Sequence, residues 1–456
     1  MKRRLTHFGV IWGNRGMDRP LPPSRRGNGA LYAVPAIHFC QPFASEVNRL
    51  CSQPATRPDA IAVELGPASA KAAMHWVKEL TAKRGRRNRF PVMLGLLKQN
   101  RRIRASLRER VFELQVKSGR DIHEFEPGVR NGKPGLSPHS VLLLSPVDSI
   151  IEAIRCALEL RVPLYGVDLE ENINRIHREV MIQDPRSCKE GLAAYTMANL
   201  PMADAGRDPE IDTPREIAMA ARLKTLLHMH GKVLFTGGMA HWLKVQELLA
   251  DDALKAAPVA PNGGGEPDAF TKVVVHPTIA VQYLDLFPPL ALAYEKVRRA
   301  PSAPPKDSGR VPDPGALYRA LLDSSYRGYF ARSPRKAFSE TRARDLESIP
   351  AFEEYLQGIQ RLSLRAVPDV FMTLNAARET MSGLFTDILS EAFMDFPWAR
   401  PRDYPGCSLL LPPSHPAAES GCALLFEEGA SPGHPIYLRS VPDFHPAPGG
   451  ARIPCR

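Results

Sequence analysis

The sequence predicts an α/β protein, with a central mostly parallel or mixed sheet flanked by helices and a C-terminal helical region. Two observations predict this fold class. From residue 31 onward, short apolar runs alternate with longer segments of helical periodicity, which is typical of strands and helices that alternate along a chain. The 456 residues are 44% hydrophobic and 24% charged, which is the composition of a packed globular protein rather than a disordered one.

Seven apolar runs predict strands, and the amphipathic segments between them predict helices. The predicted strands cover residues 31–38, 59–65, 91–97, 141–144, 163–169, 232–236 and 272–275. The predicted helices cover residues 69–83, 101–117, 147–160, 213–230 and 240–249. The run at 59–65 is the clearest strand, because Gly66 and Pro67 stop it. Helices between successive strands favour a sheet that is covered on both faces.

Composition divides the chain into five parts. These are a flexible basic arm (1–30), the α/β domain (31–299), a Pro-rich linker (300–315), a helical region (316–396) and a Pro/Gly-rich tail (397–456). In the helical region Pro334, Pro350 and Pro368 are expected to mark helix ends. Short strand candidates in the tail lie at residues 407–411, 422–426 and 436–441.

The chain lacks the sequence features of exported and membrane-spanning proteins. Its first residues are basic, but no continuous apolar stretch follows them. The longest apolar region, residues 278–294, is interrupted by Gln282, Asp285 and a Pro pair, and is shorter than a membrane span. The seven cysteines are scattered without a Cys-x-x-Cys pair. These features predict a cytoplasmic protein with reduced thiols.

Positive charge is concentrated in one segment. The chain has 60 Lys and Arg against 49 Asp and Glu, a formal net charge of +11, and many of the cations lie in residues 83–104. A basic run of this density binds phosphates in some proteins, which makes nucleic acid a candidate partner. Phe90 is the one aromatic residue available for base stacking inside the run, so a solvated basic face is the favoured interpretation.

Polar side chains follow four of the predicted strands. His38, Glu64 and Asp168 come at or just after the ends of three of them, and the fourth is followed by Gly238-Met-Ala-His241. In open α/β sheets ligands bind at the carboxyl ends of the strands, so these four groups are expected to converge. Glu64 also needs a partner there, because a buried carboxylate must be paired or neutralised.

Each of these residues also has a structural interpretation. His38 alone is more often a hydrogen-bonded structural residue than a ligand. Asp168 is a candidate cap for a helix that begins near residue 170. Thr213 and Glu216 have the spacing of a capping box, which accounts for Glu216 but leaves Arg215 without an explanation.

The order of these motifs resembles the TraB/Tiki group, which belongs with the erythromycin-esterase-like and ChaN-like proteins. The resemblance is carried by His38, by Val63-Glu64-Leu65, by Ile151-Glu152-Ala153-Ile154-x-x-Ala157 on a predicted helix, by Gly166-Val-Asp168, by Arg215-Glu216-x-x-Met219-Ala220 and by Gly238-Met-Ala-His241, and it spans residues 32–249. It implies a central sheet flanked by helices and, in the Tiki branch, a metal-dependent peptidase with paired Gly-x-x-His motifs in its site. The second motif is intact here, whereas the first has Pro35 where the family has Gly.

The chemistry of these groups is consistent with hydrolysis. His38, His241 and Glu64 make a ligand set for a divalent metal ion that leaves one position for water. Glu64 or Asp168 is then a candidate general base, and Arg215 can hold a carboxylate or polarise a carbonyl. Without a metal the same groups permit acid–base hydrolysis of an ester.

The favoured function is therefore a hydrolase that cleaves a peptide or ester bond, with metal assistance. The alternative is an inactive binding or regulatory protein that keeps the same scaffold, in which Pro35 has altered the first motif. A nucleic-acid-associated protein that uses residues 83–104 is the third interpretation.

Overall fold

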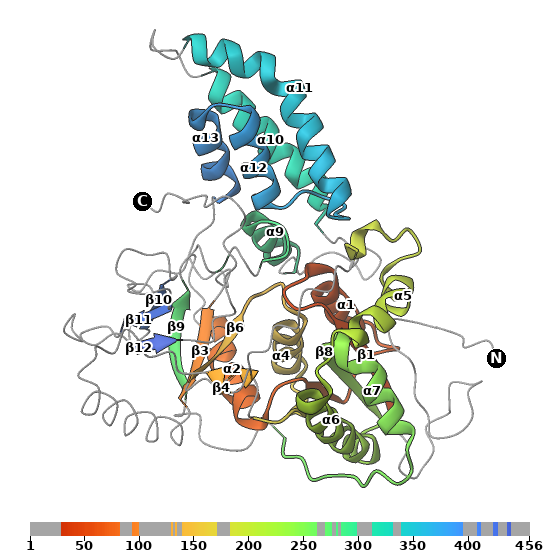
Figure 1. Ribbon diagram of the computed structural model, residues 1–456. Coiled ribbons are helices and arrows are strands. Elements are labelled where there is room, and N and C mark those ends of the chain that lie inside the picture. The colour runs from red at the N-terminus through yellow and green to blue at the C-terminus, as the bar shows by residue number, and fades with distance from the viewer. Residues whose placement is uncertain are drawn as a thin grey trace.

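The α/β class that the sequence predicts is confirmed by the computed structural model. It describes residues 29–82, 94–99, 129–130, 133–134, 139–170, 183–261, 270–275, 280, 284–298, 312–331, 339–394, 408–411, 423–426 and 436–438. Figure 1 shows an α/β body and a lobe of C-terminal helices. None of the described helices is long and apolar enough to cross a membrane.

The first sheet positions the candidate site. In the described part of the chain it has four strands in the order β1, β8, β2, β7. Their bounds are Ala30–Ala36 (β1), Lys232–Gly238 (β8), Ala60–Val63 (β2) and Leu164–Gly166 (β7). All three pairings are parallel, so all four carboxyl ends lie at one edge. The strands are almost wholly buried, which is why they read as continuous apolar runs.

Helices cover both faces of this sheet. From β1 to β2 the chain moves two places across the sheet, and from β7 to β8 it moves two places back. Because parallel crossovers are right-handed, the two moves put their helices on opposite faces. One set is α1 (Gln41–Ser52), α2 (Pro67–Ala82) and α4 (Ser149–Leu160). The other set is α5 (Leu192–Ala205), α6 (Pro209–Met229) and α7 (Met239–Ala250).

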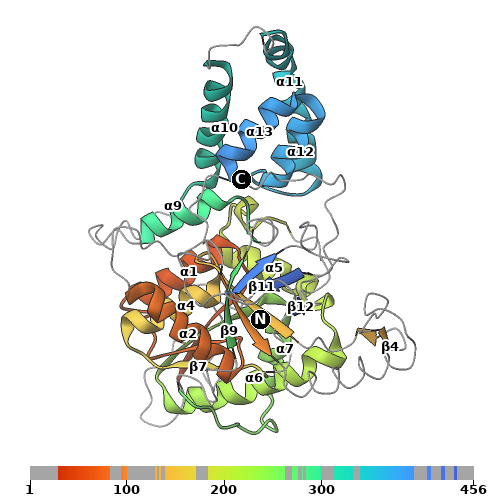
Figure 2. The same cartoon turned by 90° about the vertical axis from the view of Figure 1, so that its left-hand side faces the viewer.

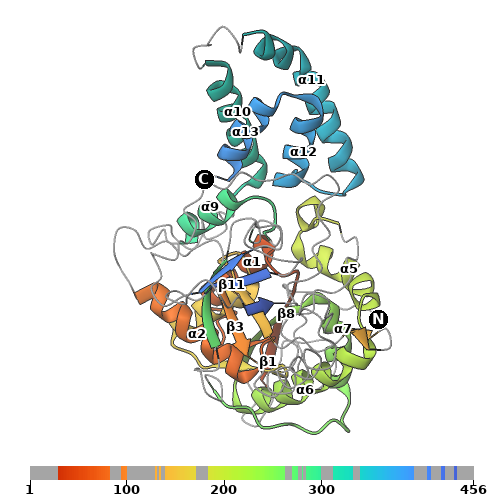
Figure 3. The same ribbon diagram turned by 60° about the vertical axis from the view of Figure 1, so that its left-hand side comes forward.

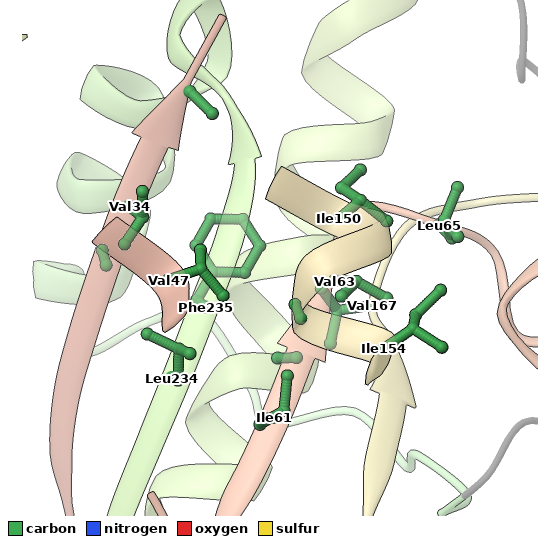
Figure 4. Packing of buried hydrophobic residues seen from close by; sticks show 14 of the residues in the cluster. Val34, Val47, Ile61, Val63, Leu65, Ile150, Ile154, Val167, Leu234 and Phe235 are labelled. Carbon is green, nitrogen blue, oxygen red and sulfur yellow. The ribbon is translucent and has the colours of Figure 1, made fainter. Parts of the chain in front are cut away.

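Apolar side chains from the strands and from α4 form the main core. Figure 4 shows Ile150 and Ile154 of α4 beside Val63 and Val167, with Phe235 of β8 nearby, and all five are buried. Burying side chains of this size contributes about 1.5–3 kcal/mol each. This packing fixes the start of α4 above the edge where the strands end.

The remaining strands form a second, mixed sheet. Within the described residues its order is β12, β11, β10, β9, β3, β6, with β9 and β10 parallel and the other pairs antiparallel. Their bounds are Leu94–Gln99 (β3), His139–Leu144 (β6), Phe270–Val275 (β9), Ser408–Leu411 (β10), Ala423–Phe426 (β11) and Ile436–Leu438 (β12). A short hairpin of β4 (Val129–Arg130) and β5 (Lys133–Pro134) lies apart from both sheets. The strand candidates of the tail therefore pair with the α/β body, which composition alone does not indicate.

The helical region forms a lobe with its own core. It consists of α10 (Pro314–Ala331), α11 (Ser339–Leu362), α12 (Val370–Thr380) and α13 (Gly383–Phe393). Buried aromatic residues at its centre include Tyr329, Phe352, Phe385 and Phe393. Figures 2 and 3 show this lobe above the α/β body, with α9 (Pro288–Arg298) between them.

Several boundaries differ from the sequence predictions. Pro350 lies inside α11 rather than at a helix end, because Phe352 and Leu356 anchor the helix to the lobe core beyond it. Pro368 does lie between two helices, and Pro334 falls outside the described residues. Helix α6 begins at Pro209 with Asp208 as its N-cap, so the capping box predicted at Thr213 is wrong. The sequence also missed α1 and α5.

Two further predictions fall wholly or mostly on residues that are not described. The predicted helix 101–117 and the flexible arm, apart from residues 29 and 30, lie outside the described residues. Of the basic run, residues 94–99 are described, as strand β3. The nucleic-acid interpretation therefore stays a prediction from composition.

Candidate functional site

The predicted site residues meet at the carboxyl edge of the parallel sheet. Glu64 directly follows β2, and His38 comes two residues after β1 ends. Asp168 comes two residues after β7, where its amide donates to the carbonyl of Leu65 at 3.1 Å. His241 is the third residue of α7, which starts directly after β8. The shared strand direction is therefore what brings these four side chains together.

His38 and His241 both lie close to Gly238. Ala36 pairs with Gly238 across β1 and β8, so His38 emerges beside this glycine. A methyl group on Gly238 would lie 3.6 Å from Nε2 of His38, 3.6 Å from Cδ2 of His241 and 3.2 Å from Oε2 of Glu64. The expectation that the two imidazoles approach each other therefore agrees with this geometry.

Pro35 does not interrupt the strand that leads to His38. It pairs with Gly237 in the register of β1 and β8. In the described part of the sheet β1 is an edge strand, and an edge strand tolerates proline because its missing N–H faces away from the neighbouring strand. The altered first motif thus keeps His38 at the sheet edge.

Glu64 is held by donors on both carboxylate oxygens. Its Oε1 accepts from Nη2 of Arg215 at 2.6 Å and lies 3.3 Å from Nε2 of His241. Its Oε2 accepts from the backbone N–H of Gly238. The side chain is 6% exposed, so these protein groups replace water around the carboxylate.

Arg215 reaches this carboxylate from α6 and binds two more. Its Nε and Nη2 donate to Oδ2 of Asp168 at 3.1 and 2.7 Å, and its Nη1 donates to Oδ1 of Asp212 at 3.3 Å. The guanidinium is 6% exposed, and burial by itself lowers its pKa, but the charges of Glu64 and Asp168 outweigh this effect and raise the pKa above its ordinary value. This position explains Arg215, which the sequence left without a structural role.

His241 is held between Glu64 and Glu216. Its Nδ1 lies 3.0 Å from Oε1 of Glu216, whose Oε2 accepts from Nη1 of Arg207 at 2.6 Å. Burial by itself lowers the pKa of His241, but the charge of Glu64 and the hydrogen bonds with Glu216 and Glu64 outweigh it and raise the pKa to about 10. The two carboxylates thus favour the cationic imidazole, against the charge of Arg215, whose Nη1 lies 3.2 Å from Nε2 of His241.

The carboxylates respond to these cations in different ways. Burial by itself raises the pKa of Glu64, but the charges of His241 and Arg215 outweigh it and hold the pKa well below the ordinary value. For Asp168 burial is the largest cause and raises the pKa, against the charge of Arg215. Glu64 is thus an ionised anchor of the cluster and is poorly suited to take up a proton.

His38 is the exposed member of the site. Its side chain is 41% exposed, and its Nδ1 lies 3.3 Å from Oδ2 of Asp148, which is buried. The loss of solvent around the ring by itself lowers the pKa of His38, but the hydrogen bond and the charge of Asp148 outweigh it and raise the pKa. In the tautomer that carries its proton on Nδ1, the nitrogen beside Gly238, Nε2, is unprotonated and can accept a proton.

Asp148 also fixes the backbone next to His38. Its Oδ2 accepts from the backbone N–H of Phe39 at 2.9 Å, and its Oδ1 caps α4 by accepting from Ile150 at 2.8 Å. Phe39 has a φ of 59°, a left-handed conformation that large side chains rarely adopt. One buried carboxylate thus orients the imidazole and holds a strained corner beside it.

Sequence reasoning missed three acids of the site. Asp148 carries a signal, since it precedes an apolar helical segment as an N-cap does, but nothing in the sequence connects it with His38. Glu216 has the spacing of a capping box with Thr213, and the sequence gives Asp212 no distinct signal. Asp148 and Glu216 bind histidines of other elements, which local patterns do not reveal. Asp212 binds Arg215 of the same helix, but the predicted helix began only at residue 213.

Glu152 belongs to a buried network that is separate from the candidate site. It is fully buried and accepts from Nε of Arg298 at 2.8 Å and from Nδ2 of Asn48 at 2.8 Å. Arg155 adds a bidentate pair with Glu295 of α9, at 2.5 and 3.1 Å. These contacts fasten α9 to α4 and α1 and lie outside the candidate site.

The residues expected to bind a metal ion are already paired with protein groups. Both oxygens of Glu64 and both nitrogens of His241 face partners in the cluster, and Arg215 supplies the positive charge next to Glu64. Among the described residues, no group of three or more His, Cys, Asp or Glu side chains is arranged to hold a metal ion. As they lie, these donors do not fit a resident metal.

No family model, curated protein or solved structure matches this chain. The resemblance to the TraB/Tiki group therefore stays a prediction that depends on the sequence motifs.

Proposed function

We propose that this protein is a hydrolase that cleaves a peptide or ester bond, with His38 as its general base. The observation that carries the proposal is the exposed imidazole of His38, which a buried Asp148 orients from behind. Its Nε2 lies beside Gly238, next to the ionised Glu64 and the cationic His241. An exposed imidazole that a carboxylate orients from behind is the usual group for removing a proton from water.

The roles of the other residues follow from their contacts. Asp148 holds the tautomer of His38 in which Nε2 accepts the proton, and it stabilises the imidazolium that results. Glu64 and Arg215 are positioning residues, since each is saturated by the other and by its neighbours. His241 places a positive charge beside the substrate position, where it can stabilise negative charge on a carbonyl oxygen.

A panel of peptides and p-nitrophenyl esters tests the proposal with three proteins. Wild type should hydrolyse at least one class, and His38→Gln should lower kcat by about 10²- to 10⁴-fold, the usual contribution of a general base. Asp148→Asn should lower kcat as well, because it favours the wrong tautomer. Absence of hydrolysis by wild type, or full activity of His38→Gln, would reject the proposal.

The same panel separates the metal-assisted form of the reaction from the metal-independent one. Metal assistance stays a prediction from the resemblance, with His38, Glu64 and His241 as the expected ligands. Bound metal in purified protein, and loss of activity on chelation with recovery on adding a divalent ion, would support it. Activity that survives chelation would support His38 acting without a metal.

A binding or regulatory role on the same scaffold is the second candidate. The saturated pairing of Glu64, Arg215 and His241 favours it, because a fully paired cluster serves stability without turnover. The outcome that points to it is a folded wild-type protein that hydrolyses nothing in the panel.

A further inference from the structure

The corner that carries His38 continues into a helix with an unusual cap. Cys40 occupies the N-cap position of α1 and makes no side-chain cap hydrogen bond. Instead, the N–H of Gln41 donates at 3.2 Å to Oδ2 of Asp285, a residue 244 positions later in the chain. The start of α1, three residues after His38, is therefore fixed by a carboxylate from a distant segment.

Asp285 is itself fixed by an arginine that is mostly shielded from water. Nη1 of Arg186 donates to its Oδ1 at 3.1 Å, and Nη2 of Arg186 donates to its Oδ2. The side chain of Asp285 is 4% exposed and that of Arg186 is 10% exposed, so water does not compete for this pair. A bidentate pair of this kind also restricts the direction of the carboxylate.

Arg186 is connected to the C-terminal lobe through Asp184. Oδ1 of Asp184 accepts from Nη1 of Arg186 at 3.1 Å, and its Oδ2 accepts from the N–H of Ala366 at 3.1 Å. The N–H of Asp184 donates to the carbonyl of Leu364 at 3.1 Å. Leu364 and Ala366 lie in the connection between α11 and α12, and Leu364 has a left-handed φ of 55°.

These contacts form one continuous path from the lobe to the His38 corner. We propose that Asp285 and Arg186 are positioning residues for His38, through which the seating of the C-terminal lobe controls the geometry of the site. The effect on turnover rests on the proposed hydrolase function, whereas the effect on the corner does not. Because Phe39 is strained, the corner keeps its shape only while contacts on both sides hold it, Asp148 on one side and Asp285 on the other.

Asp285→Asn tests the path, with Glu295→Gln as its matched control. Both changes convert a buried acid in a bidentate pair with arginine into its amide, and both acids lie within one segment of eleven residues. Asp285 accepts from the N–H of Gln41 at the start of α1, beside the corner, whereas Glu295 pairs with Arg155 farther along α4. The backbone N–H of Phe39 reports on the corner, because it donates to Asp148 rather than to either mutated residue.

The first readout is hydrogen exchange at the Phe39 amide in the full-length protein. We expect Asp285→Asn to accelerate it by roughly tenfold and Glu295→Gln to leave it unchanged. The second readout is the hydrolysis of p-nitrophenyl acetate, in which Asp285→Asn should lower kcat by about 10- to 100-fold with little change in KM, since misplacement of the base affects the chemical step.

Asp184→Asn, which disturbs the path at the lobe, provides a second variant in case Asp285→Asn does not fold. It should also accelerate exchange at Phe39. Equal acceleration by the control, or unchanged exchange in both path variants, would overturn the inference. Absence of hydrolysis in wild type would reject the proposed function, while faster exchange confined to the path variants would still support the positioning role.

Discussion

Glu64→Gln is the substitution that best separates a chemical role from a structural one at this site. Glu64 accepts from Arg215 on one oxygen and from the Gly238 N–H on the other. A glutamine has a single oxygen, so in either orientation its amide NH₂ faces one of these donors. The substitution therefore removes the charge and at least one hydrogen bond, while the volume of the side chain hardly changes.

The contacts determine the expected cost. A buried donor that loses its acceptor costs about 1–3 kcal/mol, and removal of one partner from a buried ion pair costs about 3–5 kcal/mol. Arg215 keeps Asp168 and Asp212, so its charge is not left alone, and the cost should fall at the lower end of the second range. We expect Glu64→Gln to lower the free energy of unfolding by about 3 kcal/mol.

Urea denaturation followed by tryptophan fluorescence measures this loss, because Trp76 and Trp242 are both buried in the main core. Glu152→Gln is the matched control, since Glu152 is also a buried acid but belongs to a network outside the site. Both variants should be destabilised, with Glu64→Gln also affecting hydrolysis. An unchanged unfolding midpoint for Glu64→Gln, with hydrolysis or bound metal abolished, would refute the structural role and restore Glu64 as a base or ligand.

Three further predictions follow from the same cluster and from the sequence. Gly238→Ala should fold, since the φ of −59° at this position suits alanine, but the added methyl should block the position near the two imidazoles and abolish hydrolysis. Gly237→Ala should instead lower the free energy of unfolding by about 1–3 kcal/mol, because its Cβ would lie 2.7 Å from a Glu64 oxygen. The raised pKa of His241 gives stability that is complete below pH 6.5 and is lost as the pH rises through about 10. The urea midpoint of wild type should therefore decrease as the pH is raised from 6.5 to about 10, and that of His241→Gln should decrease much less. If residues 83–104 bind nucleic acid, binding should weaken steeply with salt; no retardation of DNA or RNA at low salt would leave a solvated basic face.

The sequence predicted the edge of the sheet better than the contacts at that edge. Apolar runs that end in His38, Glu64 and Asp168 reveal strand ends, and parallel strands bring such ends together. The pattern does not state which strands pair. The runs at residues 91–97, 141–144 and 272–275 look like the others, yet their strands belong to a second sheet. Strand pairing depends on long-range packing that local periodicity does not record.

The acids around His241 and His38 show a second limit. Glu216 fits a capping box, and that local explanation removed it from consideration, although its carboxylate binds His241 of another helix. Asp148 caps α4, which is a local role, and it also binds His38, 110 residues earlier in the chain. A residue with a sufficient local role can therefore have a distant one too, and only the three-dimensional arrangement shows the second role.

The pairing in the cluster changes which residue is the better candidate for chemistry. Burial of Glu64 indicates that the carboxylate needs a partner, and the structure supplies Arg215, which is shared with Asp168. An ionised carboxylate held by two cations is a weak base, since its pKa is far below neutrality. His38 has the opposite properties: its ring is exposed, its pKa is raised from an ordinary value near neutrality, and one acid fixes its orientation. His38 is therefore the better candidate for the general base of the proposed reaction, and Glu64 holds the surrounding charged groups in place.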